Sequence, residues 1–555
     1  MRRSLVSLDA TIFDAVIIGG GITGACIAHD AALRGLSVAI IERDDFGGAT
    51  SAASSKLLHG GIRHLQQLRI DKVRESVVER SHFRRIAPHL VRWVPFLVPT
   101  DRSLRRGRWF LGCGMELYAL LGGADEPSEA SGPPTGTWID RAALAQTAPE
   151  VADGADVAGA LVVNECHLHS SERMTLAFVK TAAANGAVAA NYVAAEGLLR
   201  EGSRVVGVRA RDRERGDELR VRGRVTVNAA GPWLPGLNDR FAVGPLRRPV
   251  TGMALGAHIV TRPLTGSFAA ALSTGRASAS LVGRGGRHVF VIPWRGHSLI
   301  GTSNRSFHGD PDSAAPAEQD VAELVGDVNR ALPSAALESG DVRHAFAGLY
   351  PLTASRIESG VYQGAADYQV IDHGRHGGAE GVVSALGAKY TTARRLAELA
   401  TTVVCAKLGR PDAVCRTRET PLAGGDTPAA AVRREVAGRW GKRLEAPAID
   451  ALIHGYGAEA GRVLDRTRED PSGLRRVAPG RATIEAEVVH AVEREMATRL
   501  ADVVLRRTGL GALGHPGDDC LERCARIMAP RLGWSDAHRQ EEVRRTRALF
   551  PVAPV

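Results

Sequence analysis

Residues 13–42, FDAVIIGGGITGACIAHDAALRGLSVAIIE, decide the fold of this chain. They begin with a short apolar run, 13–18, that is typical of a buried strand, and continue through a glycine turn into a helical pattern over 25–33. A second apolar run, 37–41, ends in Glu42. Strand, G-x-G-x-x-G turn, helix, strand and acid in this order predict a βαβ unit that binds a dinucleotide.

Each glycine of the turn has a separate role in such a unit. Gly19 allows the tight turn, Gly21 lets the backbone approach a pyrophosphate, and Gly24 lets the helix pack closely on the strand. The amino terminus of the helix attracts the phosphates. The carboxylate of Glu42, at the tip of the second strand, can accept hydrogen bonds from a ribose 2′-hydroxyl, so the sequence disfavours NADP.

The next stretch, residues 43–61, separates FAD from NAD. It reads RDDFGGATSAASSKLLHGG, with small, hydroxyl and glycine residues where an NAD domain would usually continue into a second βαβ unit. Such a loop allows close approach to an extended cofactor, and the simpler alternative is a flexible surface loop. We therefore predict that the dinucleotide is FAD.

The composition is that of an ordinary globular protein. With 555 residues, two or three domains are expected, and no stretch approaches the roughly 18 uncharged apolar residues of a membrane span. The first ten residues lack the apolar core of a secretory signal, so a cytoplasmic location is expected. The net charge of +10 is compatible with an anionic substrate or a membrane surface, and no nucleic-acid motif accompanies it. The seven cysteines are scattered, and helical packing explains the spacing of Cys520 and Cys524, so no metal site is expected.

Further motifs carry a resemblance to a known family. They are IIERDDFGGATSAASSKLLHGGIRHLQ (40–66), VNAAGPW (227–233), VFVIPW (289–294) and GAKYTTARRLAE (387–398). With the glycine turn, they resemble the FAD-dependent, quinone-linked glycerol-3-phosphate dehydrogenases, within the D-amino-acid-oxidase-like flavoproteins. The resemblance implies an α/β fold with a Rossmann-like FAD-binding domain, an antiparallel-sheet substrate domain and a C-terminal helical domain.

The expected domain division is discontinuous. The FAD-binding domain is assigned to residues 1–90, 166–240 and 345–410. A substrate or cap region is assigned to 91–165, a substrate-binding sheet to 241–344, and the helical domain to 420–555, after a linker that contains Thr420-Pro421-Leu422-Ala423-Gly424-Gly425.

The cofactor site is expected to combine residues from three separate segments. The expected FAD contacts are Gly19, Gly21, Gly24, Glu42, Arg43, Thr50, Ser51, Ser54, Ser55, Lys56, His59, Gly60, Gly61, Ala230, Gly231, Trp233, Gly387, Lys389 and Thr391. By resemblance, the second of these segments closes over the adenine side and the third abuts the isoalloxazine.

The resemblance also implies three catalytic residues. His258 is the expected base, since an ordinary histidine pKa near 6.5 suits neutral pH. Arg63 and Lys389 would hold the anionic end of the substrate or stabilise negative charge on the reduced flavin. Each has a simpler alternative: a solvated surface arginine, a core histidine and a structural salt bridge.

Two positions depart from the family pattern in the phosphate pocket. An arginine expected in the GVRPL motif is Tyr350 here, and another expected before an aspartate and a tyrosine is Ala366. The aromatic position after Arg63 is His64. Each lost guanidinium removes charge-assisted hydrogen bonds worth about 1.5–3 kcal/mol. The candidate substitutes for the two missing guanidinium groups are Arg284, Arg287 and Arg356.

The resemblance implies oxidation of sn-glycerol 3-phosphate to dihydroxyacetone phosphate by hydride transfer to flavin N5, with electrons passed to membrane quinone. The protein would lie peripherally on the inner face of the cell membrane. Residues 90–98 and 109–121 are apolar and aromatic, so they are candidates either for an interfacial contact or for the domain core. A homodimer is left open.

Two other functions remain open at this point. Because the phosphate pocket is altered, a related flavoenzyme acting on another hydroxy or amino compound, with oxygen as acceptor, is the first alternative. The second is a flavin-binding protein without catalysis, against which the presence of both His258 and Lys389 argues.

Overall fold

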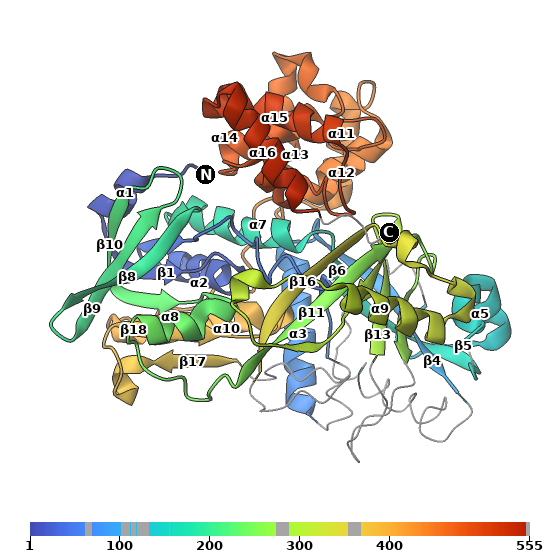
Figure 1. The fold of residues 1–555 in the computed structure, drawn as a ribbon, viewed down its shortest axis with the longest axis horizontal. Helices are drawn as coiled ribbons and strands as arrows, with labels where there is room; N and C mark the ends of the chain where they lie inside the picture. Colours follow the sequence, from blue (N-terminus) through green and yellow to red (C-terminus); the bar gives the residue numbers. More distant parts are fainter. Residues whose placement is uncertain are drawn as a thin grey trace.

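The computed structural model describes residues 1–61, 69–101, 112, 118, 133–154, 156–273, 288–352 and 368–550. The chain forms two sheets side by side, and a helical domain lies over one end of both (Figure 1). This arrangement confirms the α/β fold expected from the sequence.

The first sheet has eight strands in the described part of the chain, with β17-β18-β10-β1-β2-β7 as its main path. Strand β1 lies at the centre and pairs in parallel with β2 and β10. Its apolar run is buried, as expected for a strand covered on both faces. The bounds are β1 Ile12–Ile18, β2 Val38–Ile41, β7 Val188–Ala190, β8 Val193–Glu201, β9 Arg204–Asp212, β10 Glu218–Asn228, β17 Gln369–Asp372 and β18 Val382–Leu386.

Three helices cover one face of this sheet and share its largest apolar core: α2 (Ile22–Leu33), α7 (Ser171–Ala184) and α10 (Ala393–Lys407). Helix α2 packs closely on β1 at Gly24, where a Cβ atom would lie 1.9 Å from the carbonyl oxygen of Gly19. The glycine is therefore required by the packing that the sequence predicted. The shorter α1 (Leu5–Ala10) and α8 (Leu234–Arg240) belong to the same part of the chain, and α3 (Ile70–Ile86) joins it to the second sheet.

The second sheet has ten strands among the described residues and is antiparallel except for the β4–β12 pair. Helix α9 (Glu318–Ala331) packs on it, and α5 (Arg141–Thr147) and α6 (Pro149–Ala152) lie at its edge. The bounds are β3 Leu57–Leu58, β4 Val91–Thr100, β5 Trp138–Asp140, β6 Gly159–Leu168, β11 Gly252–Thr261, β12 Ala269–Ser273, β13 His288–Trp294, β14 His297–Gly301, β15 Arg305–Phe307 and β16 His344–Leu352.

The expected boundary between the substrate-binding sheet and the FAD-binding domain, at residue 345, differs from the position of strand β16. Strand β16 pairs with β11 along nine residues and so belongs to the second sheet, whereas the sequence placed this segment in the FAD-binding domain. By sequence, the segment 90–98 is a candidate for either a membrane contact or the domain core. Most of it forms β4, which is largely buried in this sheet. The other candidate, 109–121, lies almost wholly outside the described residues. None of the helices in the described ranges is long and apolar enough to cross a membrane.

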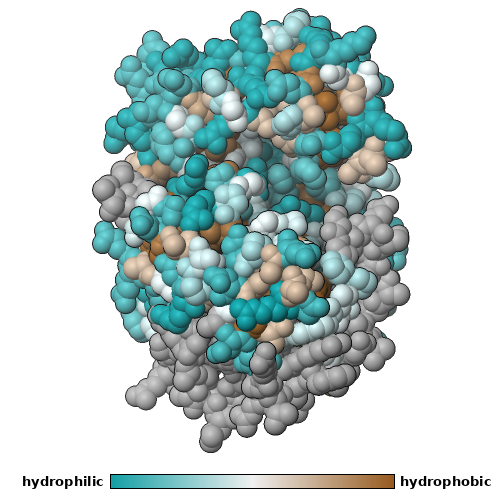
Figure 2. Space-filling view, turned by 90° about the vertical axis from the view of Figure 1, so that its right-hand side faces the viewer, coloured by the Kyte–Doolittle hydropathy of each residue, from teal (hydrophilic) through white to brown (hydrophobic). Residues whose placement is uncertain are grey.

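The helical domain has two apolar cores of its own. Its helices are α11 Ala429–Trp440, α12 Ala446–Tyr456, α13 Ala460–Asp465, α14 Glu485–Arg494, α15 Asp518–Leu532 and α16 Asp536–Ala548, with a π-helical segment, η11 Asp502–Arg507, before α15. The domain forms the upper lobe of Figure 2, where its visible surface is mostly hydrophilic with scattered apolar side chains.

A buried ion-pair cluster joins the helical domain to the loop after β2. Asp45 is fully buried and accepts hydrogen bonds from Arg506 (2.6 Å) and Arg507 (2.7 and 2.8 Å), which lie at the end of η11. Beside it, Tyr192 donates to Asp502 at 2.6 Å. Since these partners are more than 300 residues apart in sequence, the cluster ties the two domains together.

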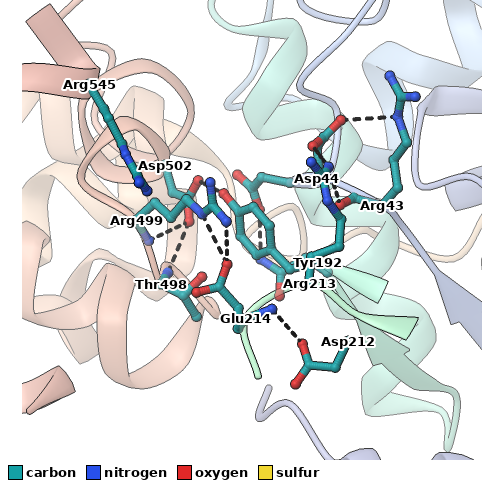
Figure 3. Close-up of polar contacts among 12 residues, drawn as sticks. Arg43, Asp44, Tyr192, Asp212, Arg213, Glu214, Thr498, Arg499, Asp502 and Arg545 are labelled. Carbon is teal, nitrogen blue, oxygen red and sulfur yellow. Dashed lines mark hydrogen bonds and ion pairs between the residues drawn. The ribbon is translucent and has the colours of Figure 1, made fainter. Parts of the chain in front are cut away.

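Figure 3 shows further polar contacts at the edge of this cluster. Arg499 of the helical domain lies 4.5 Å above the ring of Tyr192 and pairs with Glu214 at 2.7 Å. Asp44, next to Asp45, pairs with Arg43 and Arg213, and its side chain is 49% exposed. Adjacent aspartates therefore form one buried and one exposed set of ion pairs.

Replacing Asp45 with asparagine is expected to destabilise the fold by about 3–5 kcal/mol, because two buried guanidinium groups lose their carboxylate. The matched control is Asp44→Asn, which breaks exposed pairs and should cost less than about 1 kcal/mol. Unfolding monitored by calorimetry compares the two variants. Equal losses would contradict a special role for the buried pairs.

The stabilisation that the Asp45 ion pairs provide should depend on pH. Burial alone would raise the pKa of Asp45, but the charges of Arg507 and Arg506 outweigh it and lower that pKa to about 2. A lowered pKa stabilises the fold above the unfolded-state pKa of about 3.9, and this stabilisation is lost as the pH falls towards 2. The difference in unfolding free energy between wild type and Asp45→Asn should therefore be constant at neutral pH and shrink below about pH 4. Urea unfolding at a series of pH values measures it; a difference that persists at pH 2 would refute the assignment.

Candidate functional site

The glycine turn at the end of β1 is built as a nucleotide-binding turn requires. Gly19 has φ +105°, and a Cβ atom there would lie 2.8 Å from the carbonyl oxygen of Ala229. Gly21 is the N-cap of α2, and the amide of Ile22 donates to Ser51 Oγ at 2.9 Å. The turn therefore places the start of α2, where backbone amides favour phosphate, against the serine of the following loop.

Glu42 lies beside this turn at the end of β2. Its carboxylate accepts from the amides of Gly20 (2.6 Å) and Asp44 (2.9 Å). Burial raises the pKa of Glu42, and the two amide hydrogen bonds oppose that rise. A carboxylate held at the strand tip in this way can also accept from a ribose hydroxyl.

Arg43 and Trp233, both expected at the cofactor site, are in contact. The guanidinium of Arg43 lies 4.5 Å above the indole ring, and Trp233 Nε1 donates to Asp312 Oδ1 at 2.9 Å. Asp312, which sequence reasoning missed, also pairs with Arg43. It lies in η3 (Pro311–Ser313), and Trp233 ends η2 (Gly231–Trp233), so both sheets contribute to this contact.

The segment before Trp233 leaves room for a ligand. Asn228 Oδ1 accepts from the amide of Ala230 at 3.2 Å and shapes the turn. Gly231 has φ +54°, and the position where its Cβ atom would lie has no heavy atom of the described residues within 4 Å. The main chain at Gly231 is therefore not covered by these residues.

The loop 50–56 is fixed to both sheets. Thr50 Oγ1 donates to the carbonyl of Leu349 in β16 at 3.0 Å. Ser54 Oγ accepts from the amide of Lys56 at 3.2 Å. Lys56, with φ +55°, is buried, and its ammonium donates to Glu172 (2.8 Å) and Ser171 (3.1 Å) at the start of α7. The charge of Lys56 is thus used inside the protein, and its main chain is the part left for a cofactor.

A second buried carboxylate shapes the end of this loop. Glu165 of β6 accepts from the amide of Gly60 (2.9 Å), from Arg80 (2.7 Å) and from Tyr118 (2.6 Å). A Cβ atom at Gly60 would lie 1.8 Å from the hydroxyl of Tyr118, so only glycine fits. Sequence reasoning missed Glu165, although a lone acid in the apolar run GALVVNECHL was a usable signal.

The two residues beside Gly60 complete the loop. Gly61 has φ +74°, and its amide donates to His59 Nδ1 at 3.1 Å. This contact turns the chain at the last described residue before the gap at 62–68.

The turn at 387–391 lies against α3 and β3. A Cβ atom at Gly387 would lie 2.8 Å from Leu396 Cδ2 and would displace that side chain. Lys389 Nζ donates to Ser76 Oγ of α3 at 2.7 Å. Thr391 Oγ1, in η7 (Tyr390–Thr392), is buried and has no hydrogen-bond partner among the described residues. Such an atom fits a site that a cofactor completes.

His258 of β11 joins the loop 43–61, called the flavin loop below, to the second sheet. Its Nε2 lies 2.9 Å from Ser55 Oγ, and its ring stacks on Phe346 with centroids 5.3 Å apart. Gly301 on the neighbouring strand leaves room for the ring, because a Cβ atom there would lie 2.3 Å from it. The fold brings Ser55 and His258 together from 203 residues apart.

The pKa of His258 differs from the ordinary value assumed from the sequence. Burial, together with the nearby charge of Lys56, lowers it from 6.5 to about 3. At neutral pH the imidazole is therefore uncharged and can accept a proton, but its present surroundings disfavour keeping one.

Tyr350 replaces the expected arginine and forms a neutral contact. Its hydroxyl donates to Asn304 Oδ1, and its buried ring packs with Ala254 and Leu352 against Ala388. The phenol therefore lies beside the turn that carries Lys389. The expected catalytic Arg63, the neighbouring His64, the altered position Ala366, and Arg284, Arg287 and Arg356 all lie outside the described residues.

The described residues fit FAD. The glycine turn, the acid at the tip of β2, the open main chain at Gly231 and the buried hydroxyl of Thr391 come from separate segments of the chain and meet along the first sheet. The loop 50–61 lies between these groups and the second sheet, where His258 is placed. This is the arrangement of a flavin site with an adjoining substrate side.

Comparisons with known proteins identify the family of the chain. A model of the FAD dependent oxidoreductase family matches residues 14–401, and a model of the C-terminal domain of alpha-glycerophosphate oxidase matches residues 415–539. A glycerol-3-phosphate dehydrogenase from Synechocystis sp. is 30% identical over 554 residues, which cover 98% of this chain and 97% of that protein. An alpha-glycerophosphate oxidase from Streptococcus pyogenes is 26% identical and covers 99% and 97%.

A solved structure has the same fold. The glycerol-3-phosphate dehydrogenase from Bacillus halodurans, complexed with FAD, superposes with a TM-score of 0.76 at 24% identity, covering 99% of this chain and 98% of that one. FAD is thus the cofactor of this fold and this family. The family model matches residues 14–401, and a relative is 30% identical over 98% of this chain. The chain therefore belongs to the FAD-dependent glycerol-3-phosphate dehydrogenases.

Proposed function

We propose that this protein oxidises sn-glycerol 3-phosphate to dihydroxyacetone phosphate and passes the electrons to membrane quinone. The observation that carries the proposal is the contact of Ser55 with His258, which puts a neutral base where the flavin loop meets the substrate sheet. The names of the relatives from Synechocystis sp. and Streptococcus pyogenes support the substrate.

The oxidation removes a hydride from the carbinol carbon and a proton from its hydroxyl. When bound, FAD supplies the hydride acceptor. His258 is proposed to take the proton, since it is uncharged at neutral pH and hydrogen-bonded through Nε2 to Ser55. A phosphate dianion nearby would raise the pKa of His258 by favouring its charged form, and so oppose the effect of burial and of Lys56.

The phosphate is proposed to bind at the turn that carries Lys389. The ammonium of Lys389, now on Ser76 Oγ, supplies positive charge. Tyr350 and Asn304 beside this turn supply neutral hydrogen-bonding groups in place of one family arginine. Arg63, from the sequence pattern, is proposed as the second cation.

The electron acceptor distinguishes a quinone-linked dehydrogenase from an oxidase that uses oxygen. Quinone as acceptor requires a peripheral position on the inner face of the membrane, which we propose on the family resemblance. The relative from Streptococcus pyogenes is named an oxidase, so oxygen is the competing acceptor.

Anaerobic addition of glycerol 3-phosphate to the purified holoenzyme should bleach the oxidised flavin absorbance within one turnover. Subsequent addition of a short-chain quinone should restore the absorbance faster than air-saturated buffer does. Bound FAD that glycerol 3-phosphate does not bleach would refute the substrate and favour another hydroxy or amino compound. Hydrogen peroxide formed at the turnover rate would refute the quinone acceptor.

Substitution of His258 by alanine should slow flavin reduction by roughly 10²–10⁴-fold, because the hydroxyl proton loses its acceptor. Stopped-flow absorbance under anaerobic conditions measures the rate. The control is His288→Asn, an exposed histidine on β13 of the same sheet, which should leave the rate within about twofold. Normal single-turnover reduction in His258→Ala, with FAD bound, would exclude His258 as the base.

A further inference from the structure

A cavity of about 240 Å³ lies where the helical domain meets the rest of the molecule. Its walls come from four places: the start of α7, the turn between β13 and β14, helix α12, and the loops around α14 and η11 of the helical domain. The residues used below are Ser170, Arg173, Arg295, Arg481, Glu487 and Arg507. None of them is among the residues assigned above to the flavin or the substrate.

Four arginines line this cavity, and two of them are neutralised by buried carboxylates. Arg173 pairs with Glu495 at 2.6 Å, and Arg507 pairs with Asp45 at 2.7 Å. Both arginines are more than nine-tenths buried, and so are both carboxylates. The charges of these two arginines are therefore balanced inside the protein.

The other two arginines have no ion pair with a carboxylate in the part of the chain that the structure describes. Arg295 lies over the ring of Trp294 at 5.5 Å, and its Nε is buried without a hydrogen-bond partner among the described residues. Arg481 donates to the carbonyl of Pro516 at 3.3 Å. Neither guanidinium group therefore has a direct carboxylate partner among the described residues. Burial lowers the pKa of Arg295, and the more distant charges of Glu172 and Glu487 only partly oppose this.

Glu487 is the one acidic residue among those that line the cavity. Its Oε1 accepts a hydrogen bond from the amide of Ile484, at the start of α14. Burial raises the pKa of Glu487 to about 7, so this carboxyl carries only part of a negative charge at neutral pH. The pKa of the lining His169 is lowered by burial, which keeps that ring neutral. The balance of charge inside the cavity is positive.

We propose that this cavity binds a phosphate-bearing small molecule between Arg295 and Arg481. Guanidinium groups match phosphate oxygens in geometry, and a dianion would balance both charges. By volume the cavity has room for roughly eight water molecules, which is ample for a phosphate group with a short carbon chain. The site is separate from the flavin and the proposed catalytic residues.

Occupancy would stabilise the docking of the helical domain. Arg295 belongs to the second sheet, Ser170 caps α7 of the first domain, and Arg481 belongs to the helical domain. A ligand that contacts all three binds only the docked state and shifts the equilibrium towards it. A phosphorylated metabolite at this site would therefore act on the assembly of the enzyme from outside its catalytic centre.

Calorimetric titration of the holoenzyme with inorganic phosphate tests the proposal. We expect Arg481→Gln to weaken one phosphate-binding event at least tenfold and Arg481→Lys to restore part of it. Arg494→Gln, an exposed arginine of the same domain that does not line the cavity, should bind phosphate as wild type does. Isotherms that are the same for wild type and Arg481→Gln would overturn the proposal.

A second measurement locates the ligand directly. Crystals of the holoenzyme soaked in tungstate, a heavy-atom mimic of phosphate, should show anomalous density between Arg295 and Arg481. Density confined to the flavin and substrate side, with none in this cavity, would overturn the proposal. Neither measurement depends on turnover, so failure of the proposed catalytic function would leave the result interpretable.

Discussion

The carboxylate of Asp45, buried between Arg506 and Arg507, is the interaction on which the arrangement of the domains depends. It lies three residues after Glu42, the acid at the tip of β2, so the same short loop both completes the nucleotide turn and holds the helical domain. Breaking a buried ion pair by removal of one partner is far more costly than the net stability that the pair provides. We infer that the cluster fixes one mode of docking more than it adds stability.

Carboxylates also hold the flavin loop at two further points. The ammonium of Lys56 pairs with Glu172 at the start of α7, and the amide of Gly60 binds Glu165 of β6. Three carboxylates therefore anchor the loop to the helical domain, to the first domain and to the second sheet. Those of Asp45 and Glu165 are buried, and that of Glu172 is 13% exposed. A loop rich in glycine and serine would otherwise be mobile, and these anchors give it the fixed shape that a cofactor site needs.

The same burial has an electrostatic effect on the substrate side. Enclosing His258 between Ser55, Phe346 and Gly301 holds its ring in place but lowers its pKa to about 3. Lys56, which anchors the loop, adds to this effect because its positive charge lies nearby. The same contacts thus set both the position and the pKa of the His258 ring. An anionic substrate would raise this pKa without moving the ring.

The sequence by itself determined the βαβ unit, the choice of a dinucleotide and the members of the glycine turn. These features depend on residues close together in the chain, where strand and helix periodicity and the steric demands of glycine act locally. Family motifs extended the prediction to the flavin loop and to His258.

Only the tertiary structure decided which residues meet across long separations. It placed β16 in the second sheet, joined Asp45 to Arg507 across 462 residues, and paired Lys56 with Glu172. It also set the pKa of His258 and gathered the four arginines of the cavity under the helical domain. Burial and long-range charge determine these properties, and neither is fixed until the chain has folded and the domains have docked.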